Sequence, residues 1–307
     1  MAQLVAQRFL VPSVPGSSPG GTTIFNNGNL MLNTPQLIFL LFLGSFGACI
    51  GSFLNVCIHR IPLKLSIVSP PSACPFCSYQ IKFYDNIPLL SWIILSGKCR
   101  KCKAPISARY ICIEAFTAVM FVLYGLSFLQ YPDLPKSIFS ANFTGLIVHL
   151  ILLSILISCS LIDLEKGIIP NSITYPWILI ALILSFAFPQ IHFAANSRLH
   201  ALFLSFLGLV IGYGSLWIIA FIGKLISGKE VMGGGDLKLQ ALIGAFIGPV
   251  GIIVVFFIAP IIGSVWGIIH KIKTGNAYLP YGPSIAIASI VTSLYFQPIF
   301  KFLIPFY

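Results

Sequence analysis

The sequence predicts an all-α polytopic membrane protein with about eight transmembrane segments and a small cytoplasmic zinc-ribbon-like domain between the first and the second. Of its 307 residues, 57% are apolar and only 8% are charged, and the mean hydropathy is +0.97. A soluble chain of this length needs many more charged side chains on its surface, so the composition excludes a water-soluble protein. We therefore ascribe the formal net charge of +11 to membrane orientation and expect no nucleic-acid partner.

Residues 1–35 form an N-terminal extension in which Pro, Gly, Ser and Asn are frequent. It lacks the basic region and apolar run of a signal peptide, and we expect it to be disordered. Met31 directly precedes the first apolar stretch and is an alternative start of translation.

Long uncharged stretches predict the membrane spans, because about 20 apolar residues cross a hydrocarbon layer of about 30 Å. Six spans meet this criterion directly: 36–58, 112–130, 143–162, 172–189, 200–223 and 283–303. Residues 239–270 are also uncharged, but as one helix they would measure about 48 Å, which is too long for one crossing. We split this stretch at Gly248-Pro249 and expect a short segment over about 237–247, which either crosses or is re-entrant.

The cations set the orientation of these spans. If residues 59–110 are cytoplasmic, 14 of the 18 Lys and Arg residues lie on the cytoplasmic side. This distribution follows the positive-inside rule and places both termini outside.

Four of the eight cysteines form two pairs in the 59–110 domain, and each pair has two residues between its members: Cys74 and Cys77, Cys99 and Cys102. Four thiolates with this spacing close a tetrahedral site that has no open position, so we predict a structural zinc ion. Lys98, Arg100, Lys101 and Lys103 surround the second pair and would offset its negative charge. The alternative, two disulfides, is disfavoured in a reducing cytoplasm.

Two aspartates fall at predicted span ends on the cytoplasmic side. Asp163 ends the third span, and Asp236 follows three glycines and precedes the sixth segment. A carboxylate at the end of an apolar helix is costly to bury and is a candidate functional group. If the two meet, they form an acid-protease dyad in which like charges share one proton. Gly233 and Gly235 would let another backbone approach, and Lys238 would support the site or extend to the interface.

Several further motifs accompany these residues: Gly51-Ser-Phe-Leu-Asn-Val56, Arg60-Ile-Pro62, Ile106-Ser-Ala-Arg-Tyr110, Leu161-Ile-Asp163 with Ile169-Pro170, Gly233-x-Gly235-Asp236-x-Lys238 and Pro280-Tyr-Gly-Pro283. Together they resemble the type 4 prepilin leader peptidase and N-methyltransferase family, membrane aspartic proteases of the GxGD type, over about residues 38–300. The resemblance makes 111–307 the transmembrane aspartic peptidase domain, with Asp163 and Asp236 as its catalytic pair.

The resemblance also implies the reaction. The substrate is a type IV prepilin or pseudopilin with a short basic leader, cut at the cytoplasmic face of the bacterial inner membrane. The new N-terminal amine is then methylated with S-adenosylmethionine. From the residues themselves we expect Glu114 to pair with Arg109, and the acids Asp85, Glu165 and Glu230 are candidates to bind leader cations.

Two alternatives belong to other classes of protein. A transporter could use the two membrane carboxylates for ion coupling at a broken helix. Both aspartates lie at span ends on one side, however, whereas a transporter site is expected near the midplane. A zinc-domain membrane scaffold without catalysis would leave the two aspartate motifs unexplained.

Overall fold

The computed structural model describes residues 25–26, 29–30, 32–130, 143–192, 195–230, 232–275 and 280–295. The chain divides into two compact units, Met1–Asn33 and Thr34–Tyr307. In the first unit, β1 (Phe25–Asn26) and β2 (Asn29–Leu30) form a two-stranded antiparallel pair. The expectation of a disordered extension over 1–35 falls largely outside the described residues, as does the question of Met31.

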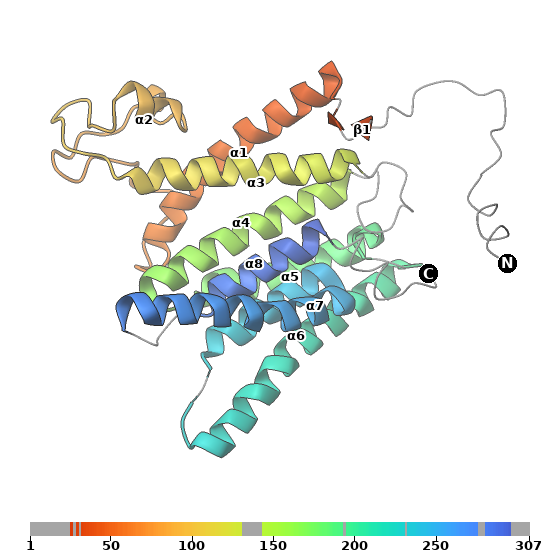
Figure 1. The fold of residues 1–307 in the computed structure, drawn as a ribbon. Helices are drawn as coiled ribbons and strands as arrows, with labels where there is room; N and C mark the ends of the chain where they lie inside the picture. Colours follow the sequence, from red (N-terminus) through yellow and green to blue (C-terminus); the bar gives the residue numbers. More distant parts are fainter. Residues whose placement is uncertain are drawn as a thin grey trace, which may run out of the picture. The chain divides into compact units, whose positions relative to one another are not determined.

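The second unit is helical. Its elements are α1 (Thr34–Arg60), η2 (Phe83–Asp85), α2 (Leu90–Ile94), α3 (Ala108–Gln130), α4 (Phe143–Lys166), α5 (Asn171–Ala187), η3 (Pro189–Ile191), α6 (Arg198–Ser227), α7 (Gly234–Thr274) and α8 (Gly282–Leu294) (Figure 1). Within the described residues, five helices are long and apolar enough to cross a membrane, namely α1, α3, α4, α6 and α7, and α5 and α8 are shorter apolar helices. The second unit is therefore all-helical and of the multi-pass membrane type. The end of the expected span 283–303 lies beyond the described residues.

Helix α7 consists of two helices joined at Gly248, as the sequence predicted. Gly248 has φ 75° and ψ −178°, which is not a helical conformation, and Pro249 follows it. Tyr281 is in contact distance of Gly263 and also interacts electrostatically with Asp236. Residues 236 and 263 would be about 40 Å apart on a straight helix, so the second half of α7 returns toward the level at which the first half began.

Close helix contacts position the two halves of α7 and the first helix pair. A Cβ atom added at Gly208 of α6 would lie 2.1 Å from the carbonyl oxygen of Gly244 in α7. A Cβ atom added at Gly51 of α1 would lie 2.8 Å from Cα of Glu114 in α3. Small residues at such crossings let the backbones approach, which is how helices pack without a hydrophobic driving force in lipid.

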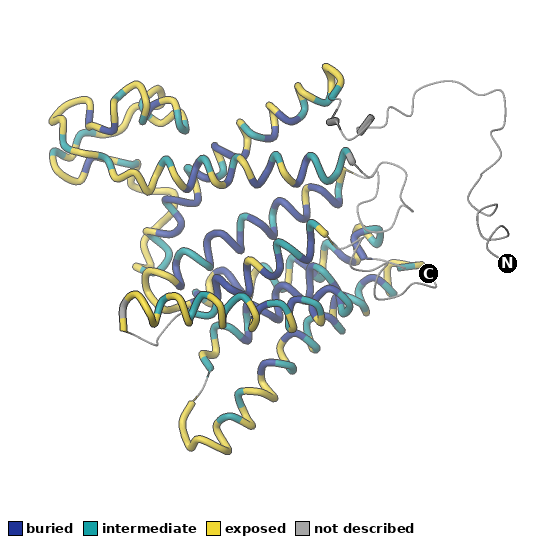
Figure 2. Tube along the Cα trace, viewed as in Figure 1, coloured by how far each residue is buried: buried dark blue, intermediate teal, exposed yellow. Residues whose placement is uncertain are grey.

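Helix α4 lies in the interior of the bundle and is buried along most of its length, and α7 contributes a second large part of the core (Figure 2). The outward faces are apolar. On α6 alone, the exposed large hydrophobic side chains are Leu199, Phe203, Phe206, Val210, Tyr213, Trp217, Ile218, Ile219, Phe221, Ile222, Leu225 and Ile226. An apolar surface of this extent would be unstable in water and is suited to lipid.

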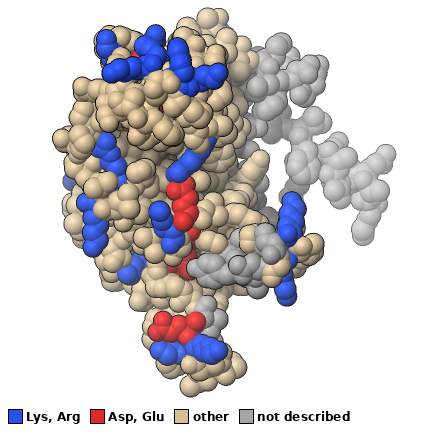
Figure 3. All heavy atoms as spheres, turned by 90° about the vertical axis from the view of Figure 1, so that its left-hand side faces the viewer, with Lys and Arg blue, Asp and Glu red and all other residues tan. Residues whose placement is uncertain are grey.

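The cations lie toward one end of these helices. Arg60 ends α1, Arg109 is in the first turn of α3, Lys166 ends α4 and Lys224 lies in the last turn of α6. Figure 3 looks onto this end and shows Lys and Arg side chains gathered in its upper part and scattered below. The clustering agrees with the positive-inside pattern on which the predicted orientation rests.

Candidate functional site

Asp163 lies in the last turn of α4, where the helix carries its two acidic residues, Asp163 and Glu165. The residue is buried, with 6% of its surface exposed. Its Oδ2 atom accepts a hydrogen bond of 3.0 Å from the backbone N–H of Gly282, in the first turn of α8. The carboxyl group is thus held by a backbone N–H 119 residues away in the chain. The Pro280–Pro283 motif begins α8 and supplies this N–H group from Gly282.

Asp236 occupies the first turn of α7, where the unpaired N–H groups of a helix favour a negative charge. Gly233 is the N-cap residue, and its carbonyl accepts a hydrogen bond of 3.1 Å from the N–H of Asp236. A Cβ atom at Gly233 would lie 3.5 Å from Oδ2 of Asp236, an ordinary contact, whereas Gly234 has open space. Glycine at 233 is therefore not required by space within the described residues.

The chain that follows Asp163 contacts the first turn of α7, which holds Asp236. A Cβ atom at Gly235 would lie 3.1 Å from Cβ of Ile169, so glycine lets the start of α7 pack on the loop after α4. At the start of α5, Oδ1 of Asn171 accepts a hydrogen bond of 2.9 Å from Nζ of Lys238, which also lies 5.4 Å from the ring centre of Tyr175. Lys238 therefore joins the starts of α5 and α7.

These contacts hold the start of α7, which carries Asp236, against the part of the chain that follows Asp163. The charge of Asp163 acts on Asp236, and that of Asp236 acts on Tyr281, so all three side chains share one electrostatic environment. Like charges near each other oppose the ionisation of both carboxyl groups, so a pair of this kind would favour a state that carries one proton.

The four predicted zinc ligands also converge. The Sγ atoms of Cys74, Cys77, Cys99 and Cys102 all lie within 4.8 Å of one another. Between the two pairs, the Sγ atoms of Cys74 and Cys102 are 3.7 Å apart and those of Cys77 and Cys99 are 3.9 Å apart. Ligands at the zinc–sulfur distance of about 2.3 Å on a tetrahedron are about 3.8 Å apart. The distances are far too long for disulfides, and all eight cysteines are free. The donor set and its dimensions fit a metal ion bound by four thiolates.

Each cysteine pair, Cys74 with Cys77 and Cys99 with Cys102, lies in a tight turn that we call a knuckle, and the two knuckles have the same backbone structure. In each, the residue after the second cysteine has positive φ, Ser78 at 54° and Lys103 at 59°, and donates its N–H to the carbonyl of the first cysteine. In each, the residue before the first cysteine forms a bridge with the residue six positions after that cysteine. N–H groups of Cys102 and Lys101 also donate to the thiol of Cys99 and lower its pKa to about 6, which favours the thiolate.

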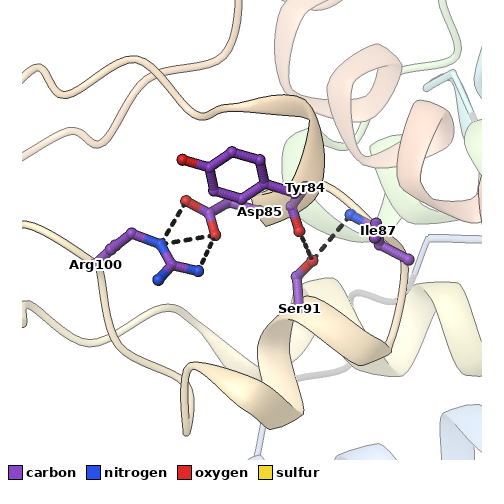
Figure 4. A network of polar contacts seen from close by, with 5 residues as sticks. All are labelled: Tyr84, Asp85, Ile87, Ser91 and Arg100. Atoms are coloured by element: carbon purple, nitrogen blue, oxygen red, sulfur yellow. Dashed lines mark hydrogen bonds and ion pairs between the residues drawn. The ribbon is translucent and has the colours of Figure 1, made fainter.

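A polar network supports this domain between the knuckles (Figure 4). The carboxylate of Asp85 accepts bonds from Nε and Nη2 of Arg100, and its side chain is 6% exposed. These bonds hold the pKa of Asp85 below its usual range. Oγ of Ser91 donates to the carbonyl of Tyr84 and accepts from the N–H of Ile87. Arg100 therefore stabilises the domain through its bonds to Asp85, in addition to any effect of its charge on the nearby thiolates.

The expected Glu114–Arg109 pair is wrong. Arg109 pairs with Glu165 at 2.5 Å, and Glu114 accepts a bond of 2.8 Å from the N–H of Leu89. Residues five positions apart do not share a helix face, so Glu114 points to the four-cysteine domain while Arg109 reaches α4. The other candidate acids are paired as well, Asp85 with Arg100 and Glu230 with Lys224 at 3.6 Å.

The sequence reasoning did not identify Gly282 as the donor to Asp163, nor Asn171 and Tyr175 as partners of Lys238. The Pro280–Pro283 motif contained the signal for Gly282, but nothing local indicates which carboxylate its N–H would meet. Asn171 directly follows the Ile169-Pro170 motif, and its position there was the available clue.

Comparisons with known proteins cover both parts of the chain. The sequence profile described as "Bacterial Peptidase A24 N-terminal domain" matches residues 45–128, and that described as "Type IV leader peptidase family" matches residues 150–268. The chain is 32% identical over 293 residues to a "Prepilin leader peptidase/N-methyltransferase" of Dichelobacter nodosus, covering 86% of this chain and 94% of the relative.

Two further relatives agree. A protein of the same name from Neisseria gonorrhoeae is 32% identical over 79% of this chain and 85% of its own length. A "Type 4 prepilin-like proteins leader peptide-processing enzyme" of Escherichia coli is 33% identical over 83% of this chain and 93% of its own length. Among solved structures, none matches this chain.

Proposed function

Because this chain belongs to the type IV leader peptidase family, we propose that it is a membrane aspartic endopeptidase that removes the leader peptide of type IV prepilins or pseudopilins. The observation that carries the proposal is the convergence of Asp163, the Gly282 N–H and Asp236 at the ends of three helices. We place this site at the cytoplasmic face of a bacterial inner membrane, since the cations gather at the same helix ends.

In the proposed reaction the two carboxyl groups share one proton. The ionised carboxylate removes a proton from a water molecule as the water oxygen adds to the scissile carbonyl carbon. The protonated carboxyl gives its proton to the carbonyl oxygen, and a tetrahedral gem-diol forms. The C–N bond then breaks as a proton passes from the first carboxyl to the leaving amine, while one hydroxyl of the gem-diol returns its proton to the second carboxylate and the product carboxyl group forms. Gly282 contributes by fixing the orientation of Asp163, and Gly235 and Lys238 by holding the start of α7 in place.

The ion-coupled transporter receives no support from the relatives, which cover most of this chain and are named as peptidases. Their names also include an N-methyltransferase, and on that ground alone we propose that the cleaved pilin is methylated on its new N-terminus, with S-adenosylmethionine as methyl donor.

We further propose that the four cysteines bind zinc and that the ion is structural. Four thiolates occupy every position of a tetrahedral zinc site, so the ion would hold the two knuckles together and take no part in chemistry. Metal analysis of purified protein should find about one zinc ion per chain. Cys99→Ser should reduce this strongly, whereas Cys49→Ser, in α1 and exposed, should not. Wild-type protein with far less than one zinc per chain would refute the site.

The proposed activity is tested by co-expression with a type IV prepilin and mass spectrometry of the pilin. Wild-type protein should yield pilin without its leader and with the mass of one added methyl group. Asp163→Asn and Asp236→Asn should each leave the leader attached, and Glu230→Gln, which removes an exposed acid, should not. Normal cleavage by either aspartate variant would exclude the dyad.

A further inference from the structure

Four side-chain atoms in the described part of the chain are buried without a hydrogen-bond partner: Nε2 and Oε1 of Gln240, Oγ of Ser284 and Oγ of Ser289. All three residues are 0% exposed. Buried polar groups are nearly always hydrogen-bonded, and those that are not require an explanation.

Other buried polar side chains of this protein do find partners. Thr292, in the same helix as both serines, donates to the carbonyl of Ala288. Ser205 of α6 donates to the carbonyl of Ala245, and Thr117 of α3 donates to that of Ile113. Thr292 and Thr117 bond to the carbonyl four residues earlier in their own helix, as helical Ser and Thr commonly do, and Ser205 bonds across to α7. The exceptions are therefore specific to positions 240, 284 and 289.

These positions follow the residues that form the candidate dyad. Gln240 is four residues after Asp236, so it lies one turn farther along α7 on the same face, about 6 Å deeper. Ser284 is two residues after Gly282, which donates to Asp163, and Ser289 is about 7.5 Å farther along α8. All four unpartnered atoms thus lie in the two helices that begin at the dyad.

We propose that Gln240, Ser284 and Ser289 bind water molecules beneath Asp163 and Asp236 and that this water supplies hydrolysis. The full burial of the three residues allows only a very small ligand. A primary amide offers two donors and a carbonyl oxygen, and each hydroxyl both donates and accepts, so each of the three side chains can supply part of the two to four partners that a buried water needs.

The inference rests on the proposed function, in which a carboxylate takes a proton from water. Asp163 is only 6% exposed, so little bulk water reaches its carboxyl group even though it lies near a helix end. Water retained beside the carboxyls would be present when the substrate binds. Gln240, Ser284 and Ser289 would act as positioning residues, and they would affect turnover rather than substrate affinity.

The kinetic test uses the full chain in lipid nanodiscs with a prepilin substrate. Gln240→Met keeps the length of the side chain and removes its polar atoms. We expect kcat to fall about tenfold with KM within about twofold and with Tm within about 3 °C of the wild type. Ser284→Ala should change kcat in the same direction. Ser205→Ala is the matched control, because its hydroxyl is equally buried but has a partner, and it should lower Tm while kcat stays unchanged.

A second measurement needs no substrate. Hydroxyl radicals formed from bound water oxidise neighbouring sulfur atoms, and Cys159 is a fully buried cysteine within range of the charge of Asp163. Radical footprinting should label Cys159 in the wild type, should label it much less in Gln240→Met, and should leave the buried Cys57 of α1 unlabelled in both.

The outcomes separate the two proposals. Unlabelled Cys159 in the wild type, equal labelling in Gln240→Met, or unchanged kcat in Gln240→Met would each overturn the water site. A wild-type protein that does not cleave prepilin would overturn the proposed function instead, and footprinting would still decide whether water is bound.

Discussion

Replacing Gly282 by alanine adds a methyl group beside the carboxyl group of Asp163. The backbone of Gly282 lies in the first turn of α8 and has no positive φ, so alanine is free of backbone strain there. The added Cβ atom would lie 2.6 Å from Oδ2 of Asp163, whereas ordinary contacts begin at 3.4 Å. The carboxyl group must therefore move by about 0.8 Å, or the start of α8 must move instead.

Either movement displaces one member of the proposed dyad. Because misplacement of a reacting group by about 1 Å can cost about 100-fold in rate, we expect kcat/KM for prepilin cleavage to fall about 50-fold, or about 2.3 kcal/mol. Folding should survive, since a Gly→Ala change in a helix reduces the entropy of the unfolded chain. The assay is cleavage of a prepilin by protein in nanodiscs, with thermal unfolding of the same samples as a check on folding.

Gly234→Ala is the matched control. Position 234 is another helical glycine beside the dyad, but an added Cβ atom meets nothing within 4 Å. We expect its kcat/KM to stay within about threefold of the wild type. Wild-type activity of Gly282→Ala, or an equal loss in both variants, would refute the view that the Gly282 contact orients Asp163.

Two other predictions follow from the helix crossings and the four-cysteine domain. Gly244→Ala should destabilise the protein by about 1–3 kcal/mol through the α6–α7 contact, whereas Gly214→Ala, with open space on α6, should not lower Tm; equal Tm values in detergent would contradict this. Since Arg100 keeps the folded-state pKa of Asp85 below its unfolded value, the stabilisation from Asp85 is present above about pH 4 and is lost as pH falls through the folded pKa. Asp85→Asn should thus increase the rate of proteolysis of the domain at pH 7 and change it little at the lowest pH. An increase of the same size at both pH values would be evidence against the Asp85–Arg100 bond.

The features that the sequence predicted are those with local causes. The break at Gly248-Pro249 was predictable because a proline interrupts an apolar stretch too long for one span, and the structure shows non-helical torsion angles at that glycine. The cysteine cluster was predictable because each pair forms its knuckle within a few residues. Composition alone was enough for the class of fold.

The features that it missed join distant parts of the chain. Asp163 and Gly282 are 119 residues apart, and Lys238 and Asn171 are 67 residues apart. No periodicity or capping pattern encodes which helix start meets which carboxylate. Glu114 shows a different limit, because its proximity to Arg109 along the helix suggested a pair, whereas tertiary contacts gave each residue a different partner.

The central claim is that Asp163 and Asp236 act as one catalytic unit, and a double-mutant kinetic cycle tests it most directly. The quantity to measure is kcat/KM for prepilin cleavage by Asp163→Asn, Asp236→Asn and the double variant. We expect each single change to reduce it by about 1,000-fold or more and the double change to reduce it by no more than either one, since a dyad that has lost one member has no function left to lose. Losses that multiply in the double variant, or substantial cleavage by either single variant, would contradict the account.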